Sequence, residues 1–116
     1  MELQKLVEQV KSHPDIHQAG MILAHNGIVR ATSRDGSPVE KIEVRADHRA
    51  LDHILEEYRR KEGIVDIQAK VLEGTLHPGD DIMYLVVAGD FRENVIPVMT
   101  DLIDAVKRDV TAKREF

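Results

Sequence analysis

Two strand-type segments near the middle of the chain are joined by a connection too short to hold a helix. Apolar and polar residues alternate from Val65 to Val71, whereas the segment from Ile82 to Ala88 is almost wholly apolar. The connection contains the turn-forming run His77-Pro78-Gly79-Asp80. Because parallel neighbours need a crossover of about a dozen residues or more, usually a helix, we expect these two strands to pair in antiparallel orientation.

Two further strands are predicted in the first half of the chain. The apolar run from Ala19 to Ala24 indicates a buried strand that continues to Arg30. Gly27 interrupts it, and a glycine within a strand often marks a bulge. Apolar and charged residues then alternate from Ile42 to Ala46, as in a half-buried strand. The polar residues 33–38 between them are typical of a turn or an exposed loop.

Three segments carry apolar residues at helical spacing. The first ends at His13-Pro14, because the residue before proline is pushed out of the helical region. The second begins with Asp47 as its N-cap and ends before Gly63. In the third, Asn94 is the expected cap. The apolar face of this last helix consists of Val95, Val98, Met99, Leu102, Ile103, Val106 and Val110.

The predicted order of elements is α-β-β-α-β-β-α. This order favours an α+β fold with a mostly antiparallel sheet and helices packed on it. The chain has 116 residues, of which 42% are hydrophobic. We therefore expect one domain over residues 1–116 with a core that needs no covalent staples.

Composition excludes several functional classes. The absence of cysteine rules out disulfides, thiolate catalysis and iron–sulfur clusters. A net charge of −5, no long basic run and only 3% aromatic residues disfavour nucleic acid as the main partner. No apolar signal core is present, and the longest apolar stretch, from Ile82 to Gly89, is far shorter than a membrane helix. We expect a soluble, cytoplasmic protein that does not act on a membrane.

Metal, cofactor and nucleophile motifs are not recognisable. The six histidines lack the spacing that would align three or four ligands, so no metal site is predicted. The paired carboxylates fall in a turn or on a solvated helix face, where they need no catalytic role. The glycines match neither a phosphate-binding loop nor a dinucleotide fingerprint, and we expect no cofactor.

Basic residues at the ends of the predicted elements form the one notable constellation. Arg30 follows an apolar strand, and Arg92 follows the buried strand that ends near Ala88. Lys107 lies in the last helix and Lys113 follows it. If the two strands are neighbours, both arginines could face one site, and such a cluster suits phosphate or another anion. The alternative is that these charges are simply solvated at element ends.

Four segments, in their order and spacing, resemble the MoaE family, the large catalytic subunit of molybdopterin synthase. The resemblance extends from about Leu3 to Glu115. The segments are AGMILAHNGIVR at 19–30, GTLHPGD at 74–80, LVVAGDFR at 85–92 and LIDAVKRDVTAKRE at 102–115. They are similar to the family's strand ending in Val-Arg, its Gly-x-Leu-x-x-Gly-acid turn, its strand before a His-Arg pair and its lysine-bearing helix.

This resemblance implies an α/β hammerhead fold and a sulfur-transfer reaction. A small ubiquitin-like carrier, whose C-terminal Gly-Gly ends as a thiocarboxylate, supplies the sulfur. The enzyme, a transferase of molybdenum cofactor biosynthesis, places two sulfurs on cyclic pyranopterin monophosphate and so builds the molybdopterin dithiolene. The implied assembly is a homodimer of large subunits within a heterotetramer, with one carrier at each far end.

The resemblance also assigns roles to the basic residues. Arg30 matches the strand-end arginine and Arg92 the arginine of the His-Arg pair, and both would bind the substrate phosphate. Lys107 and Lys113 match the two active-site lysines. As catalytic residues they would transfer protons, attract the tail of the carrier or link to it transiently.

Several positions depart from the family pattern. Phe91 stands where the histidine of the His-Arg pair is expected, and phenylalanine cannot transfer a proton. The other departures are His25 for an aromatic residue, Val71-Leu72 for a His-Arg pair, Val44-Arg45 for Tyr-Glu, Ala112 for an aromatic residue and a lysine spacing one residue shorter.

Three hypotheses follow: an active sulfurtransferase, a carrier-binding scaffold of the same fold that has lost the chemistry, and an unrelated anion-binding domain.

Overall fold

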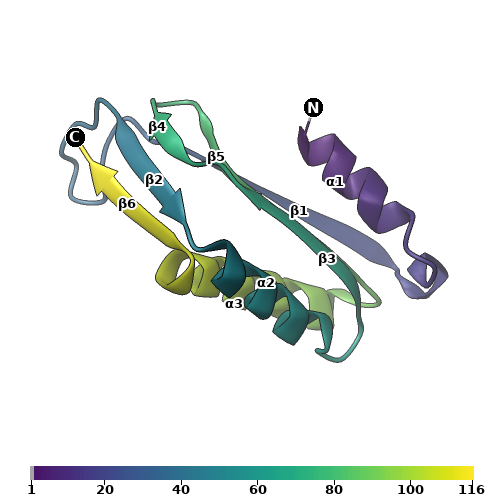
Figure 1. Cartoon of the computed structure of the whole chain (residues 1–116). Helices are drawn as coiled ribbons and strands as arrows, with labels where there is room; N and C mark the ends of the chain where they lie inside the picture. Colours follow the sequence, from purple (N-terminus) through teal and green to yellow (C-terminus); the bar gives the residue numbers. More distant parts are fainter. Residues whose placement is uncertain (1) are drawn as a thin grey trace.

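The computed structural model describes residues 2–116 and confirms an α+β fold with antiparallel sheets (Figure 1). The helices are α1 (Glu2–Lys11), α2 (His48–Arg59) and α3 (Arg92–Asp109), with a short 3₁₀ turn, η1 (Ile16–Gln18). The strands are β1 (Met21–Ile28), β2 (Ile42–Ala46), β3 (Ile64–Val71), β4 (Gly74–Leu76), β5 (Asp81–Gly89) and β6 (Thr111–Glu115). None of the helices in this part of the chain is long and apolar enough to cross a membrane.

The first sheet has the strand order β1-β5-β3, and β5 runs antiparallel to both neighbours. This arrangement confirms the pairing predicted from the short connection between β3 and β5. Leu23 of β1 and Ile67 of β3 both lie opposite Val87. The register shifts between Gly27 and Ile28, as expected near this glycine, but the extra residue is Ile82 of β5 and not a residue of β1.

Strand β5 is apolar on both faces because both faces are covered. On one face, Met83, Leu85 and Val87 belong to the main core together with residues of α2 and α3. On the other face, Val86 and Ala88 pack with apolar residues of α1. Figure 1 shows α1 on one side of this sheet and α2 and α3 on the other. The near-continuous apolar run of β5 is therefore a consequence of its central position.

A second sheet, with the order β4-β2-β6, contains two strands that the sequence does not predict. Strand β4 has three residues and lies inside the connection between β3 and β5. The last strand, β6, occupies residues that the sequence presents only as a tail after the helix. It pairs along the whole of β2, and the backbone N–H of Phe116 extends the pairing with a 2.9 Å bond to the carbonyl of Lys41. Thr-Ala-Lys-Arg-Glu lacks an apolar alternation, so no strand signal was available.

Of the two predicted helix caps, one is confirmed and one is wrong. Asp47 caps α2 as predicted, because its side chain accepts a hydrogen bond of 3.0 Å from the backbone N–H of Ala50. The prediction for Asn94 is wrong, since α3 begins at Arg92 and Phe91 takes the cap position without a side-chain bond. The Asn94 side chain instead donates to the Asp90 carboxylate at 2.9 Å, which ties the first turn of α3 to the end of β5.

Candidate functional site

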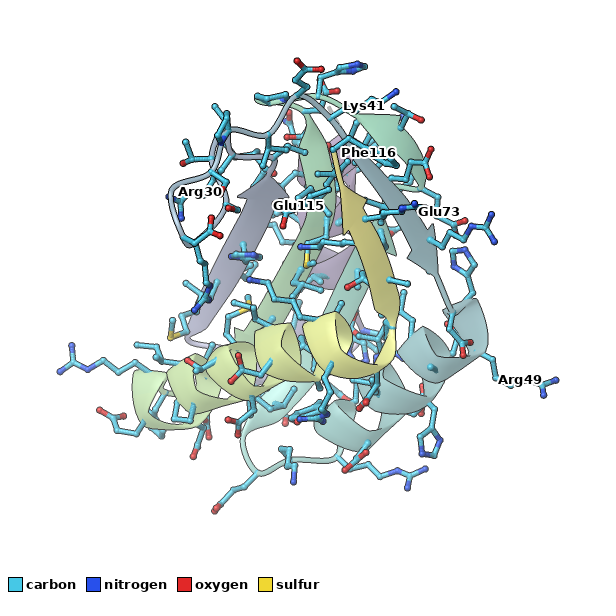
Figure 2. All side chains as sticks on the ribbon, turned by 90° about the vertical axis from the view of Figure 1, so that its left-hand side faces the viewer. Arg30, Lys41, Arg49, Glu73, Glu115 and Phe116 are labelled. Carbon is cyan, nitrogen blue, oxygen red and sulfur yellow. The ribbon has the colours of Figure 1, made fainter. Side chains whose placement is uncertain are left out.

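An open cavity of about 670 Å³ lies where the end of β1 and the loop after it meet β6 and the last turn of α3. Figure 2 views this face, with Arg30 on the loop that follows β1 and Glu115 on β6. Its charged lining comes from three separate segments of the chain. These charged residues are Arg30, Arg34, Asp35, Lys107, Lys113 and Glu115.

Arg30 reaches the cavity because the chain is fixed just before it. Val29 is 4% exposed, and its backbone forms hydrogen bonds of 2.9 Å to the carbonyl of Asp80 and from the N–H of Gly79. These bonds join the end of β1 to the turn before β5. The Arg30 side chain is left on the surface, where it donates a weak 3.4 Å bond to the Thr32 hydroxyl. Its guanidinium is therefore available to a ligand in the cavity.

Lys113 lines the same cavity as Lys107, although the lysine spacing is shorter than the family pattern. The reason is that Lys113 lies in a strand, where alternate residues share a face. Lys113 and Glu115 line the cavity, whereas Arg114 between them stacks on the Phe116 ring with 5.2 Å from its guanidinium carbon to the ring centroid. Burial and then the charge of Lys107 lower the pKa of Lys113, and Glu115 acts in the opposite direction.

His25 is a neighbour of this cluster that the sequence presents as an isolated histidine. It is half-buried in β1, and a Cβ on Gly27 would lie 3.5 Å from its Nε2. Burial and then the charge of Lys107 lower the pKa of His25, which keeps its imidazole neutral at neutral pH. The available signal was its place on the apolar strand that precedes Arg30, two residues before Gly27.

The loop after β1 is a hydrogen-bonded hairpin that brings Arg34 to the cavity. The N–H of Gly36 bonds to the carbonyl of Ser33 at 3.0 Å, and the N–H of Ser33 bonds to the carbonyl of Ser37 at 2.9 Å. Bonds from Ser33 and Ser37 hold the pKa of the Asp35 carboxyl at about 2. The residue pattern predicts the turn but gives no sign that Arg34 lines the cavity.

Arg92 is not among the residues that line this cavity. Strand β1 is antiparallel to β5, so that Ile28 lies opposite Asp81 and Met21 opposite Gly89. Arg30 therefore lies at one end of the sheet and Arg92 at the other, and the expectation that both face one site is wrong within a single chain. A helical rise of 1.5 Å per residue separates Arg92 from Lys107 by about 22 Å along α3. The Arg92 side chain is 79% exposed and pairs with Glu93 at 3.4 Å.

Apolar side chains are exposed both beside Arg92 and at the cavity. Phe91 and Ile96, at the start of α3, are 66% and 48% exposed, and Ile28, which lines the cavity, is 52% exposed. Across residues 2–116, no three His, Asp or Glu side chains converge as a metal-binding group. The cationic side chains at the cavity can bind an anion, and lysine and histidine can also transfer protons.

Comparison with known proteins places the chain in a family context. The family model described as MoaE protein matches residues 1–109, so Lys113 lies beyond the matched segment. A protein of Haloferax volcanii described as a probable molybdopterin synthase is 32% identical over 114 residues. That alignment covers 93% of this chain but 43% of the relative, so the chain spans less than half the length of that protein.

Solved structures share the fold at low sequence identity. Molybdopterin cofactor biosynthesis protein E from Burkholderia multivorans has a TM-score of 0.79 at 22% identity, covering 100% of this chain and 77% of its own. Molybdopterin synthase from Staphylococcus aureus has a TM-score of 0.73 at 21% identity, with 85% and 75% covered. A complex of subunits 1 and 2 of molybdopterin-converting factor from Helicobacter pylori has a TM-score of 0.72 at 17% identity, with 99% and 78% covered.

Proposed function

The chain belongs to the MoaE family of molybdopterin synthases, which act in molybdenum cofactor biosynthesis, and we propose that it is an active sulfurtransferase. Its substrates are a thiocarboxylated ubiquitin-like carrier and cyclic pyranopterin monophosphate, and its product is the molybdopterin dithiolene. The reaction takes place in the cytoplasm. The observation that carries the proposal is the gathering of Arg30, Lys107 and Lys113 around one cavity.

Each group has a role that its chemistry supports. The Arg30 guanidinium binds the phosphate of the pterin with paired hydrogen bonds. Lys107 and Lys113 are the catalytic residues, which attract the carboxylate-like end of the carrier and move protons. The lowered pKa of Lys113, caused by burial and by Lys107, increases the fraction of neutral amine that can accept a proton.

The transfer is an exchange of sulfur for oxygen. For each sulfur, the acyl C–S bond of the carrier tail and a C–O bond of the pterin side chain break, and a C–S bond to the pterin side chain forms. One oxygen, from the pterin side chain or from water, passes to the carrier and leaves it with an ordinary carboxylate. No electrons are gained or lost overall, so the exchange needs no oxidant or reductant.

The carrier tail suits an open cavity that ends in cations. A Gly-Gly segment has no side chains, so its extended backbone can reach between Arg30 and the two lysines. The Helicobacter pylori structure, a complex of two subunits of molybdopterin-converting factor, supports a protein partner of this kind. We therefore include the carrier as the partner of this chain.

A homodimer accounts for Arg92, which lies too far from the cavity to act in its own chain. The exposed Phe91 and Ile96 beside it, and the exposed Ile28 at the cavity, are surfaces that a second copy would cover. In a twofold dimer each copy would contribute Arg92 to the cavity of the other, because such an interface is reciprocal. Arg92 then binds substrate phosphate alongside Arg30, within a heterotetramer of two large subunits and two carriers.

A second candidate is a carrier-binding protein that has kept the fold and lost the chemistry. The observation that favours it is Phe91, which stands where the resemblance predicts a histidine and offers no proton donor. This candidate retains affinity for the carrier but forms no product. The two candidates therefore differ in one measurable property, which is whether product is formed.

The deciding experiment is product formation by the native protein. The protein is mixed with thiocarboxylated carrier and the pyranopterin precursor, and the dithiolene product is detected after oxidation to its fluorescent derivative. Lys113→Ala is the inactive comparison, and Arg49→Gln, on the outer surface of α2, is the matched control. Turnover by the native protein and by Arg49→Gln is the expected result. Carrier binding without turnover would replace the proposal with the second candidate.

A further inference from the structure

The cavity holds two arginines of one chain, only one of which the resemblance assigns. Arg30 and Arg34 both line it and are both exposed at their side chains. Among residues 2–116, neither forms an ion pair within 4.0 Å. Two guanidiniums without a carboxylate partner at one cavity favour a shared anionic ligand.

The hairpin fixes where Arg34 is presented. Arg34 and Asp35 are the central residues of a turn closed by the bond from Gly36 to Ser33. Gly36 has a φ of +87°, a conformation that L side chains rarely adopt. The bond from the N–H of Val39 to the carbonyl of Ala31, 2.8 Å long, closes the base of the hairpin. These backbone bonds thus hold Arg34 in a defined position at the edge of the cavity.

Two carboxylates, Asp35 and Glu115, line the cavity with Arg34, but neither pairs with it. The Asp35 carboxylate accepts bonds from the Ser33 hydroxyl and from the N–H of Ser37, the latter at 2.9 Å. Glu115 is on β6, next to Lys113 on the same face of the strand. The cavity as a whole carries four cationic and two carboxylate side chains, so its charge remains positive.

We propose that Arg34 is a second anion-binding residue of this cavity, which acts together with Arg30 of the same chain on the phosphate group of the ligand. The identity of that ligand as a pterin phosphate rests on the proposed function, whereas the anion site does not. Arg30 and Arg34 give the cavity two arginines from one chain, in addition to the Arg92 that a second copy would contribute. Arg34 is thus a substrate-binding residue that determines affinity rather than a proton donor.

Inorganic phosphate is the probe that tests the site without any assumption about catalysis. Its binding is followed by amide chemical shifts of the full chain, in the native protein and in Arg34→Gln, Arg30→Gln and Arg49→Gln. Arg49 is the matched control, because Figure 2 shows it on α2, pointing away from the cavity. We expect saturable shifts in residues 27–36 and 107–115 of the native protein. Arg34→Gln and Arg30→Gln each raise the Kd about five- to tenfold, and Arg49→Gln leaves it within about twofold.

A second variant tests whether the position of the Arg34 guanidinium matters as well as its charge. Gly36→Val keeps Arg34 but strains the turn that positions it, so it also raises the Kd for phosphate. Under turnover, Arg34→Gln raises KM for the pterin and leaves KM for the carrier unchanged. An unchanged Kd in Arg34→Gln, or no saturable shifts in the native protein, would overturn the proposal. Phosphate binding that depends on Arg34 in a protein without turnover would instead sink the proposed function and leave this site intact.

Discussion

Lys107 on α3 and Lys113 on β6 line one cavity, and after burial the charge of Lys107 is the next cause of the lowered pKa of Lys113. The pair exists because β6 returns along β2 directly after the helix ends. A strand placed there turns Lys113 back toward the last turn of α3. The relationship therefore depends on an element that the sequence pattern does not reveal.

Removal of Lys107 should raise the pKa of Lys113. A positive neighbour disfavours the protonated amine, so replacing Lys107 with glutamine removes one of the two causes that lower the pKa. The measurement is an NMR titration of the Lys113 side chain in Lys107→Gln. Arg108→Gln is the control, since it removes a cation from the same helix turn but not from the cavity. An equal shift in both variants would show that the effect is not local.

Lys113→Ala should abolish turnover and leave stability almost unchanged. The residue lies at the surface with only its amine partly buried at the cavity, and it forms no ion pair among residues 2–116, so the expected loss in free energy of unfolding is under about 0.5 kcal/mol. A proton-transfer group is worth about a hundredfold or more in rate. Denaturant unfolding and product formation are measured on the same preparation. Full activity in this variant would remove Lys113 from the catalytic role.

His25 should make the protein less stable as the pH falls. Its pKa in the folded state lies below 6.5, because burial and then Lys107 disfavour the charged imidazole. The unfolded chain therefore binds the proton first, and the free energy of unfolding decreases as the pH falls from 6.5 toward the folded pKa.

The test compares His25→Gln with the native protein in denaturant at about pH 8 and about pH 5. The variant should lose less stability between these pH values than the native protein does, and His53→Gln, which replaces an exposed histidine of α2, is the control. An identical decrease in His25→Gln and the native protein would contradict the assignment.

Much of the first sheet could be predicted from the sequence, because its strands follow from local patterns. The alternation in β3, the apolar run of β5 and the short turn between them predict the antiparallel pair that the structure contains. Gly27 likewise predicts an irregularity near the end of β1, although the extra residue at that point belongs to β5. These features depend on residue periodicity and turn chemistry, which act over a few residues.

The site was harder to predict because it depends on which ends of the strands meet. Arg30 and Arg92 both follow strands of one sheet, but antiparallel pairing sends the two strand ends in opposite directions. The strand that carries Lys113 has no apolar pattern and forms only because β2 has an open edge beside it. Arg34 and His25 needed the three-dimensional structure, since neither belongs to a motif with fixed spacing.

Gly63→Ala should destabilise the protein by about 2–3 kcal/mol. Gly63 has a φ of +77°, and a Cβ there would lie 2.3 Å from Oδ1 of Asp90. The same carboxylate accepts from the N–H of Phe91 and from Asn94, so the clash would disturb the start of α3. Gly79→Ala is the control, because its φ of +92° is also positive but nothing lies within 4 Å of its Cβ position.

The expected loss for Gly79→Ala is about 1 kcal/mol, from backbone conformation alone. Both variants are compared by the midpoint of denaturant unfolding at an unchanged slope. Equal losses would mean that the contact with Asp90 contributes nothing and that the backbone conformation explains the whole effect.

Two inactive variants should restore activity to each other if a second copy supplies Arg92. Arg92→Ala removes the arginine that the proposed dimer contributes to the partner's cavity, and Lys113→Ala removes the lysine of a chain's own cavity. In a mixed twofold dimer, one of the two cavities then holds both an intact Lys113 and an intact Arg92. Random mixing of equal amounts makes half of the dimers mixed, so about a quarter of the native turnover should return.

Turnover is measured after the two variants are mixed and given time to exchange subunits. The control is a mixture of Lys107→Ala and Lys113→Ala, which should stay inactive, because both lysines serve the same cavity of one chain and every cavity in the mixed dimer lacks one of them. A return of activity only in the mixture containing Arg92→Ala would place Arg92 in the cavity of the second copy. No return in either mixture, with dimers present in solution, would show that a second copy does not supply Arg92. Full turnover by Arg92→Ala alone would show that Arg92 has no part in the site.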